Sequence, residues 1–553
     1  MTDFVTHLRN RISDDREFVF TRDDGGTARL TFTELDRRAR ATAAWLARRG
    51  LTDQPALLLY PAGLDFTVAF LGCLYARVPA IPAPLPDAGA PHASRVRTLM
   101  RDAGARLVLT DPAHASGLSG LSARVADAAT ADPDAWTPPA LTGGTIAYLQ
   151  YTSGSTSDPR GVEVSHGNLL HNLELFRSLA RDRPVRRLAG WLPHYHDMGL
   201  VGLQLQALHA GADLVFMSPA AFVARPVRWL ELISRYGADW TVSPDFGYAW
   251  CTRRITDEQL AGLDLSTLTM ALSGAEPIRA RTLADFERRF APAGFRPATW
   301  NPGYGLAECT LMVTCVAQGR GATVRRFDPS ALQRHRAVPA PGGTPLVACG
   351  PVSGLDLRIV DPGGSGPVAD GEIGEIWVAG PSVALGYRGR PAETRAIFRA
   401  GDGRWLRTGD LGFLLDGQLY VTGRIKDVII VNGRNLYPQD LEEAAARANP
   451  AAGRSAAFGV RRDDGGEHVV LVQEVRRGQS GTLGEAADRV MDQVTREFGI
   501  PLSLMLVPRG AVRQTTSGKL RRRHMRELFL SGDLTPLHAE LEPAVNDLLE
   551  TVA

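Results

Sequence analysis

The first 350 residues alternate between short apolar runs, which predict buried strands, and longer amphipathic stretches, which predict helices. Residues 29–50 are typical of a strand followed by a helix, with Thr33 as the expected N-cap. We expect a strand at 56–60, a helix at 65–77 and a loop across the Pro-rich stretch 79–91. Further buried strands are predicted at 107–109, 188–192, 213–217, 240–242 and 269–272. This alternation favours parallel sheets covered by helices.

The pattern changes after about residue 350. Short strands separated by Gly, Asp and Pro predict a compact antiparallel, barrel-like β unit, with strands expected at 355–360, 375–379 and 419–422. From Asp427 a smaller α+β section runs to the last residue. It is expected to contain helices near 438–448 and 483–498 and strands near 469–475 and 504–508. The predicted fold class is therefore α/β, with a large N-terminal domain and a small α+β C-terminal domain.

Composition narrows the range of functions. The chain has 553 residues, 44% hydrophobic and 22% charged, and a net charge of +2, so we expect no nucleic-acid partner. The short basic stretch 521–524 is interpreted as a solvated helix start. Five cysteines without metal-ligand spacing predict reduced thiols. The N-terminus lacks an apolar signal core and no apolar run is long enough to span a bilayer. We expect a cytoplasmic protein without stable membrane insertion.

Lysine is nearly absent from the chain. Of 62 basic residues, only Lys426 and Lys519 are lysines. Lysine is a compact point charge on a flexible stem, whereas arginine is a wide planar fork. We therefore expect both lysines to lie where arginine would fail.

A run rich in hydroxyls and glycine, residues 151–162, follows the apolar stretch 145–149. Hydroxyl groups and a flexible backbone form a nest of hydrogen-bond donors for phosphate oxygens. The run is not a Walker A loop, because the Gly-Lys-Ser/Thr ending is absent. The alternative is a hydrophilic β-turn.

An aromatic and histidine-rich turn at 191–200 precedes an apolar helix, as at the mouth of an acyl pocket. We expect Trp191, Gly199 and Phe246 to belong to that pocket. The alternative is a metal site built from the histidines of the turn and Asp197. We expect His194 to be a surface residue.

Three further turns carry groups suited to a nucleotide. Small residues at 272–277 let a flat base approach the backbone. The segment 301–308 supplies the ring of Tyr304 and the carboxylate of Glu308, and the turn 407–412 supplies Asp410. Without the other motifs, the alternatives are a helix N-terminal charge for Glu308 and an ordinary turn former for Asp410.

Taken in this order over nearly the whole chain, the motifs resemble the adenylate-forming superfamily of acyl-CoA synthetases, peptide-synthetase adenylation domains and luciferases. The resemblance implies an ATP- and acyl-binding domain at 1–425 and a mobile domain at 426–553 that carries the catalytic lysine. It also implies ATP and Mg²⁺ as cofactors.

The resemblance implies a role for each motif residue. Lys519 is the catalytic lysine, Lys426 the hinge and Glu308 the Mg²⁺ ligand, while His196 gates the acyl tunnel. The pyrophosphate of ATP is gripped by Thr152, Ser153, Gly154, Ser155 and Thr156. The base and ribose are contacted by Gly274, Ala275, Glu276, Tyr304, Gly305, Asp410 and Arg424. One departure is Arg160, which stands where the family has lysine.

Three features resemble the fatty acyl-AMP ligases within this superfamily: the turn 195–200, the segment 433–442 and a long link containing an expected insertion at 319–346. The implied reaction activates a fatty acid with ATP to acyl-AMP and pyrophosphate. The acyl group then passes to the phosphopantetheine thiol of a holo acyl carrier protein. The insertion predicts that CoA is a poor acceptor and that removing 319–346 admits it; the alternative is a tolerated surface loop.

Three other functions remain open. The first is an acyl-CoA synthetase that uses CoA as the acceptor. The second is an amino-acid adenylation domain, in which Asp245 would hold the substrate amine. The third is a non-catalytic nucleotide or lipid binder on the same fold, which the retention of Glu308, Asp410 and Lys519 disfavours.

Overall fold

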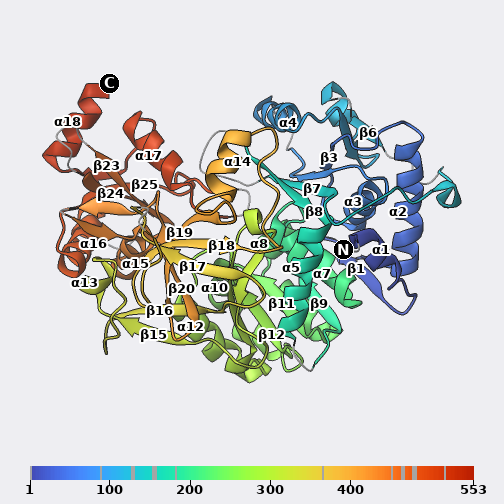
Figure 1. Ribbon diagram of the computed structural model, residues 1–553. Coiled ribbons are helices and arrows are strands. Elements are labelled where there is room, and N and C mark those ends of the chain that lie inside the picture. Colours follow the sequence, from blue (N-terminus) through green and yellow to red (C-terminus); the bar gives the residue numbers. More distant parts are fainter. Residues whose placement is uncertain are drawn as a thin grey trace.

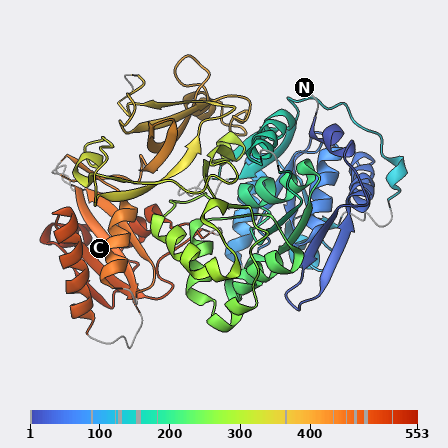
Figure 2. The same cartoon turned by 90° about the horizontal axis from the view of Figure 1, so that it is seen from below.

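The structure is a computed structural model. It describes residues 3–552 except 87–89, 122, 126–130, 152–158, 181–182, 364–365, 432, 450–451, 462–466, 476–481 and 516–517. Figures 1 and 2 show the N-terminal elements in blue and green on one side and the C-terminal elements in red on the other. The yellow strands of the β unit lie beside both groups.

Two mostly parallel sheets form the centre of the N-terminal part. The larger has the order β14-β13-β12-β11-β9-β10-β1-β2, and the smaller has the order β6-β5-β3-β4-β7-β8. The pairs β13–β14, β1–β2 and β7–β8 are antiparallel and lie at sheet edges. The strands of the larger sheet are β1 (Glu17–Thr21), β2 (Thr27–Thr31), β9 (Arg187–Gly190), β10 (Asp213–Met217), β11 (Trp240–Ser243), β12 (Met270–Ser273), β13 (Trp300–Gly305) and β14 (Met312–Cys315). Those of the smaller are β3 (Ala56–Leu59), β4 (Ala80–Ala83), β5 (Leu107–Thr110), β6 (Ala123–Val125), β7 (Ile146–Tyr151) and β8 (Gly161–Ser165).

Helices cover these sheets, as the apolar strand runs require. All four residues of β3, β4 and β5 are buried, which leaves no face for water. The helices before the β unit are α1 (Phe4–Arg9), α2 (Phe32–Ala47), α3 (Leu64–Tyr75), α4 (Ala90–Ala103), α5 (His166–Leu179), α6 (Asp197–Gly199), α7 (Gln206–Ala210), α8 (Pro219–Ala224), α9 (Val227–Tyr236), α10 (Asp245–Arg254), α11 (Asp257–Ala261) and α12 (Ala280–Phe290). The predicted α/β class with helix-covered parallel sheets is confirmed.

The β unit is a six-stranded antiparallel sheet of the order β15-β16-β20-β19-β18-β17. Its strands are β15 (Val324–Phe327), β16 (Thr344–Pro351), β17 (Asp356–Val360), β18 (Gly374–Ala379), β19 (Leu406–Leu415) and β20 (Gln418–Arg424), and its helices are α13 (Pro329–Leu332) and α14 (Pro391–Phe398).

The C-terminal part centres on the sheet β23-β24-β25-β26. Its elements are β21 (Ile429–Val431), β22 (Arg434–Leu436), α15 (Pro438–Ala448), β23 (Ser455–Arg461), β24 (Glu467–Val475), α16 (Leu483–Phe498), β25 (Ser503–Pro508), α17 (Arg522–Leu530), β26 (His538–Glu540) and α18 (Pro543–Val552). Residues of α15 and α16 form one apolar cluster with this sheet, and residues of α17 and α18 form another. The domain division at 425/426 stays a prediction.

Two local predictions are wrong. The N-cap of α2 is Thr31, whose hydroxyl accepts a hydrogen bond from the Glu34 amide at 3.2 Å, and not Thr33. The stretch 79–91 is not only a loop, since β4 lies within it and α4 begins at Ala90. Proline disguised β4, because it lacks the N–H of a strand residue, although the strand is fully buried between β3 and β7.

In the part of the chain that the structure describes, no helix is both long and apolar enough to cross a bilayer.

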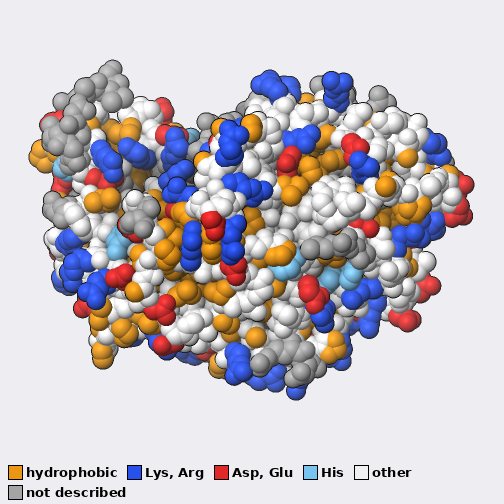
Figure 3. Space-filling model, viewed as in Figure 1, with side chains coloured by type: hydrophobic (Ala, Val, Ile, Leu, Met, Phe, Trp, Pro, Cys, Tyr) orange, Lys and Arg blue, Asp and Glu red, His pale blue; other side chains and the backbone are white. Residues whose placement is uncertain are grey.

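Basic and acidic side chains are interspersed on the face seen in Figure 3. All five cysteines are buried and free, as the sequence predicted for reduced thiols.

Candidate active site

The carboxyl ends of neighbouring parallel strands gather the motif residues at one edge of the larger sheet. Strands β9, β11, β12 and β13 are successive neighbours in that sheet. They lead into the turn that begins at Trp191, the start of α10, the segment 274–276 and the pair Tyr304–Gly305. Ligands of α/β proteins bind at such an edge. The fold therefore brings together four segments that are far apart in sequence.

The segment after β12 passes close to the backbone of β13. A Cβ on Gly274 would lie 2.9 Å from the Gly303 carbonyl oxygen, so only glycine fits there without a shift. Ala275 has φ +66°, in the left-handed region that a non-glycine residue rarely adopts. This strained turn is a flat backbone surface of the kind that a planar base can approach.

Asp410 lies at the centre of a hydrogen-bonded group. It stands opposite Arg424 in the register of β19 and β20, and the Arg424 Nε donates to its Oδ1 at 2.8 Å. The Tyr304 hydroxyl donates to Oδ2 at 2.7 Å. The carboxylate is 5% exposed. Three of the predicted ribose and base residues, Tyr304, Asp410 and Arg424, thus lie together and hold one another in place.

Glu308 follows β13 and faces the β unit. Its Oε1 accepts a hydrogen bond from the Tyr387 hydroxyl at 2.8 Å. Its Oε2 makes no hydrogen bond to any residue that the structure describes. A hard carboxylate oxygen held in this way suits Mg²⁺, which takes few protein ligands and several from phosphate or water. The residues present therefore fit the implied ion.

The predicted pyrophosphate residues Thr152, Ser153, Gly154, Ser155 and Thr156 lie outside the described residues. Arg160, just after them, pairs with Glu393 of α14 at 3.1 Å. Its guanidinium lies 5.5 Å from the centre of the Tyr387 ring. The arginine that replaces the family's lysine is thus engaged by a carboxylate and a ring.

The histidine-rich turn holds one prediction that stays a prediction, the gating role of His196, and one that is wrong, the exposure of His194. His196, the predicted gate, is half-buried in the site, and its Nδ1 lies 2.7 Å from Asp197 Oδ1. His194 is not a surface residue: it is 4% exposed and its ring packs against Phe66 at 4.1 Å. Burial lowers the pKa of His194 to about 3, so the ring is neutral and packs as an apolar group. The turn leads into a buried helix, and its polar sequence does not indicate that burial.

The metal-site alternative gains no support from this turn. Among the residues that the structure describes, no three His, Cys, Asp or Glu side chains are grouped to hold a metal ion.

The residues predicted for the acyl pocket lie next to one another. The ring of Trp191 stacks on Phe222 at 3.8 Å and meets Phe246 edge-on at 5.7 Å. A Cβ on Gly199 would lie 2.1 Å from the Pro193 carbonyl oxygen, so this glycine allows α6 to pack on the turn. Directly after it, residues Leu200–Leu205 form a π-helical turn (η3), a feature frequent at functional sites.

Lys519 is half-buried, and we use the word cleft for the region between it and the motif residues Asp197, Glu276 and Asp410 whose charges act on it. Burial lowers the pKa of its ammonium, and Arg424 also lowers it, while the carboxylates of Asp197, Glu276 and Asp410 oppose this effect. These partners belong to three different predicted motifs. We call residues 514–519, which end in Lys519, the lysine loop. A Cβ on Gly518 of this loop would lie 3.2 Å from Cε1 of Phe246, so the lysine loop touches the predicted acyl pocket.

Two acids near Lys519 have pKa values that are shifted in opposite directions overall, although the Lys519 charge lowers both. Burial raises the pKa of Asp197, but the charges of His196 and Lys519 and the Met198 amide outweigh burial, so the net pKa is lowered. Burial and the nearby Asp245 raise the pKa of Glu276 to about 7, against the Phe246 amide and the charge of Lys519. The ammonium therefore faces one firmly ionised carboxylate and one that titrates near neutrality.

Lys426 has different surroundings. It is exposed in the short connection between β20 and β21, where the β unit joins the C-terminal part. This placement suits a pivot. Its role as a hinge stays a prediction.

The expected insertion contributes β15 and α13 to the β unit. It also contacts the C-terminal part: the Gln333 carbonyl accepts from the Asn435 amide at 3.1 Å, and its side chain accepts from Arg434 at 2.8 Å. The segment 319–346 therefore does not hang free as an unattached surface loop.

Sequence analysis missed two residues of the site. The Tyr387 hydroxyl holds the Glu308 carboxylate through a hydrogen bond, and Tyr387 belongs to none of the motifs. Asp197 was considered only as a metal ligand, yet it is buried and acts on Lys519. Its position next to His196 in a turn that enters an apolar helix was the available signal.

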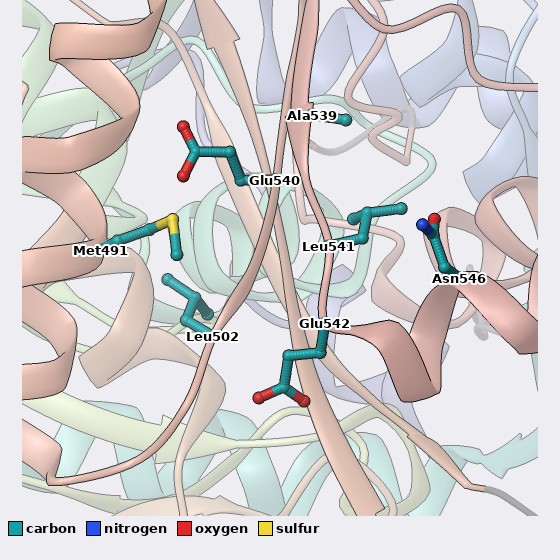
Figure 4. Close-up of a pocket in the computed structure, with 7 residues that line it drawn as sticks. All are labelled: Met491, Leu502, Ala539, Glu540, Leu541, Glu542 and Asn546. Carbon is teal, nitrogen blue, oxygen red and sulfur yellow. The ribbon is translucent and has the colours of Figure 1, made fainter.

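A separate hollow of about 490 Å³ opens in the C-terminal part, between α16, β26 and α18 (Figure 4). Two of its lining carboxylates are already paired, Glu542 with His468 at 2.7 Å and Glu540 with His538 at 2.9 Å. It contains none of the motif residues.

Comparisons with known proteins agree with this geometry. The sequence model of the family described as AMP-binding enzyme matches residues 7–388. The medium-chain-fatty-acid acyl-carrier-protein ligase JamA of Moorena producens is 41% identical over 544 residues, which is 93% of this chain and 92% of the relative. FadD21 of Mycobacterium tuberculosis, provisionally named a fatty-acid–CoA ligase, is 38% identical over 546 residues, covering 90% and 91%. A solved structure from work on fatty acyl-adenylate ligases of E. coli and L. pneumophila superposes with a TM-score of 0.88 at 31% identity, covering 96% of this chain and 98% of that one.

Proposed function

Because the chain belongs to the family of AMP-binding enzymes, we propose that it is a fatty acyl-AMP ligase. It activates a fatty acid with ATP to acyl-AMP, releases pyrophosphate, and transfers the acyl group to the phosphopantetheine thiol of a holo acyl carrier protein. The observation that carries this proposal is the position of Lys519, which lies among Asp197, Glu276 and Asp410 of the N-terminal motifs.

In the first half-reaction a fatty carboxylate oxygen attacks the α-phosphorus of ATP and the bond to pyrophosphate breaks. Such chemistry depends on positioning and charge neutralisation. Lys519 supplies a point charge between the carboxylate and the α-phosphate, next to Phe246 of the acyl pocket. Asp410 and Arg424 hold the ribose, and the backbone at Gly274 receives the base. Glu308 would hold Mg²⁺, and the ion would supply charge neutralisation for pyrophosphate.

In the second half-reaction the C-terminal part turns at Lys426 and withdraws Lys519, which opens the cleft to the carrier's thiol. The thiol sulfur attacks the acyl carbonyl carbon, the bond to AMP breaks, and the thiol proton passes to solvent. None of the chain's own cysteines supplies this sulfur, since all five are buried. Burial raises the pKa of Cys73, Cys251, Cys309, Cys315 and Cys349, which keeps these thiols protonated.

The amino-acid adenylation alternative is disfavoured by the surroundings of Asp245. Its carboxylate is fully buried, and it accepts hydrogen bonds from the Arg279 amide at 3.0 Å and the Thr282 hydroxyl at 2.9 Å. These bonds tie α10 to the start of α12. A carboxylate committed in this way does not serve as the anchor of a substrate amine.

Two observations favour a carrier protein over CoA as the acyl acceptor. JamA, named for a carrier-protein acceptor, is the more similar of the two relatives described above. The insertion 319–346 also holds the C-terminal part through Gln333, which favours an acceptor other than CoA. The buried, free thiols are consistent with the proposed cytoplasmic location.

Mass spectrometry of the products tests the proposal. The protein is incubated with ATP, Mg²⁺ and a panel of fatty acids, without an acceptor, with CoA, or with a holo acyl carrier protein. We expect acyl-AMP in the first arm and, in a fourth arm that contains both acceptors, the acylated carrier protein as the main product. Acyl-CoA as the main product would move the protein to the CoA-ligase branch. Absence of pyrophosphate with every fatty acid would reject the activation step.

A further inference from the structure

The start of α17 carries a charge arrangement that helix physics disfavours. The helix begins at Arg522 and continues with Arg523, and its N-cap Arg521 makes no side-chain cap. Cations are unfavourable at a helix N-terminus, where the macrodipole is positive. Arg522 lies three residues after Lys519, so this start is also the base of the lysine loop.

Two nitrogen atoms of the Arg522 guanidinium bind the carboxylate of Glu442. Its Nε and Nη2 donate to Oε1 and Oε2 of Glu442 at 2.7 and 2.8 Å, a bidentate pair. Glu442 lies in α15 and is 5% exposed, and its Oε1 also accepts from the Ala457 amide of β23 at 3.1 Å. The pair therefore fixes the base of the lysine loop to α15 and to the sheet.

The third guanidinium nitrogen reaches towards the predicted hinge. Arg522 Nη1 lies 3.7 Å from Oδ2 of Asp427, the residue directly after Lys426. Asp427 also lies within the field of Arg424, which pairs with Asp410. Acidic and basic side chains therefore alternate from Asp410, the proposed ribose ligand, past the predicted hinge to α15. In order, they are Asp410, Arg424, Asp427, Arg522 and Glu442.

Local hydrogen bonds shape the described residues of the lysine loop. The Lys519 amide donates to the Thr515 hydroxyl at 3.1 Å, and the Thr515 amide donates to the Lys519 carbonyl at 2.8 Å. The bidentate pair of Arg522 and Glu442, three residues downstream of Lys519, attaches the end of this loop to α15.

We propose that Arg522 is a positioning residue for acyl-AMP formation: its fork fixes the lysine loop to α15, and its contact with Asp427 stabilises the orientation in which Lys519 lies in the cleft. The inference rests on the function proposed above. Lysine cannot replace Arg522, because one ammonium does not make a bidentate pair and reach Asp427 as well.

The chain itself provides a readout that does not depend on activity. Lys426 and Lys519 are the only lysines, so trace labelling of the native protein with acetic anhydride reports on two side-chain amines, one exposed and one half-buried. The ratio of acetylated Lys519 to acetylated Lys426, read by mass spectrometry of peptides, measures how firmly Lys519 is held. The variants are Arg522→Lys, Arg522→Met and Glu442→Gln. Arg523→Met is the matched control, because Arg523 is an exposed neighbour that pairs with Glu527 of the same helix at 3.2 Å.

We expect Arg522→Met to raise the labelling ratio about threefold by freeing the loop, and Arg523→Met to leave it unchanged. Acyl-AMP formation by Arg522→Lys should fall about tenfold in kcat, with KM for ATP within about twofold and with transfer from supplied acyl-AMP preserved. Thermal unfolding of each variant, followed in parallel, separates loss of positioning from loss of folded protein.

An unchanged labelling ratio in folded Arg522→Met would overturn the positioning role. Equal loss of both half-reactions in Arg522→Lys would overturn it as well. These outcomes differ from a failure of the proposed function, in which the unaltered protein forms no acyl-AMP while the labelling ratio still responds to Arg522. If Arg522→Met does not fold, Arg522→Lys and Glu442→Gln carry the same labelling test.

Discussion

The nucleotide-binding side of the cleft and the lysine loop that faces it are held in different ways. Asp410 is fixed by Tyr304 and Arg424 at 2.7 and 2.8 Å, and Glu308 is fixed by Tyr387 at 2.8 Å. Lys519 is half-buried, and its charge interacts with groups that lie across the junction between the two parts of the chain.

The difference indicates that one region serves binding and the other serves the chemical step. The binding groups are preorganised by hydrogen bonds within the large part, so they are ready before ATP arrives. The position of Lys519, for which we propose the catalytic role, depends on where the C-terminal part lies. A change on the nucleotide side should therefore weaken binding, whereas a change in the lysine loop should slow chemistry.

The largest effect should come from Lys519→Arg. The charge is retained, but the planar guanidinium is wider than the ammonium and does not fit between carboxylate and α-phosphate. We expect acyl-AMP formation to slow about 100-fold, with KM for ATP nearly unchanged. Pyrophosphate release measures both quantities. Activity close to that of the unaltered protein would show that the site needs only a positive charge there.

Asp410→Asn should act on binding instead. The amide accepts hydrogen bonds less strongly than the carboxylate and leaves Arg424 without its counter-charge. We expect KM for ATP to rise about tenfold, equivalent to about 1.4 kcal/mol, with a smaller change in kcat. Asp416→Asn, on the exposed turn of the same hairpin, is the control and should change neither. A change confined to kcat would erase the proposed distinction between the two regions.

Tyr387→Phe should sharpen the comparison on the nucleotide side. Removing the hydroxyl frees the Glu308 carboxylate without emptying the space that the ring fills. We expect the Mg²⁺ concentration for half-maximal rate to rise about threefold, since one hydrogen bond to a charged group is lost. Titration of the rate with Mg²⁺ checks this, and Tyr236→Phe, remote from the cleft, serves as the control. An unchanged Mg²⁺ requirement would remove Tyr387 from the site.

The smallest effect should be a pH dependence carried by Glu276, whose pKa burial and Asp245 raise to about 7. Ionised Glu276 attracts Lys519 into the cleft, so acyl-AMP formation should fall about twofold as pH drops through 7. Stability should change in the opposite sense. The native state holds this proton more tightly than the unfolded chain, so the free energy of unfolding should decrease as pH rises from about 4.5 to 7.

Glu276→Gln should flatten both dependences. Burial also raises the pKa of Asp440 to about 7, so Asp440 titrates in the same pH range as Glu276. Its contribution is present in both the unaltered protein and Glu276→Gln, and the difference between the two profiles removes it. A rate profile with the same acid limb in Glu276→Gln would assign that limb to another group.

The sequence predicted most of the framework because its signals are local. Apolar runs located β3, β5 and β9 to β12 to within a residue or two, and the length and periodicity of 483–498 located α16. Proline disguised β4, and His194 was misplaced because an imidazole in a polar turn gives no sign that the turn packs against Phe66.

The motif residues were found because glycine-rich turns follow buried strands. Their partners were not, because Tyr387 reaches Glu308 across 79 positions and Arg522 reaches Glu442 across 80. Such contacts depend on how separate elements pack, which no local pattern records. The pyrophosphate residues 152–156 lie outside the described residues, so their role stays a prediction.

The central claim is that Lys519 serves the first half-reaction and leaves the cleft for the second. The direct measurement is to compare both half-reactions in Lys519→Ala: acyl-AMP formation from ATP and a fatty acid, and acyl transfer to holo carrier protein from supplied acyl-AMP. The account predicts a loss of at least about 100-fold in the first and a change of less than about threefold in the second. Equal losses in the two half-reactions would contradict it.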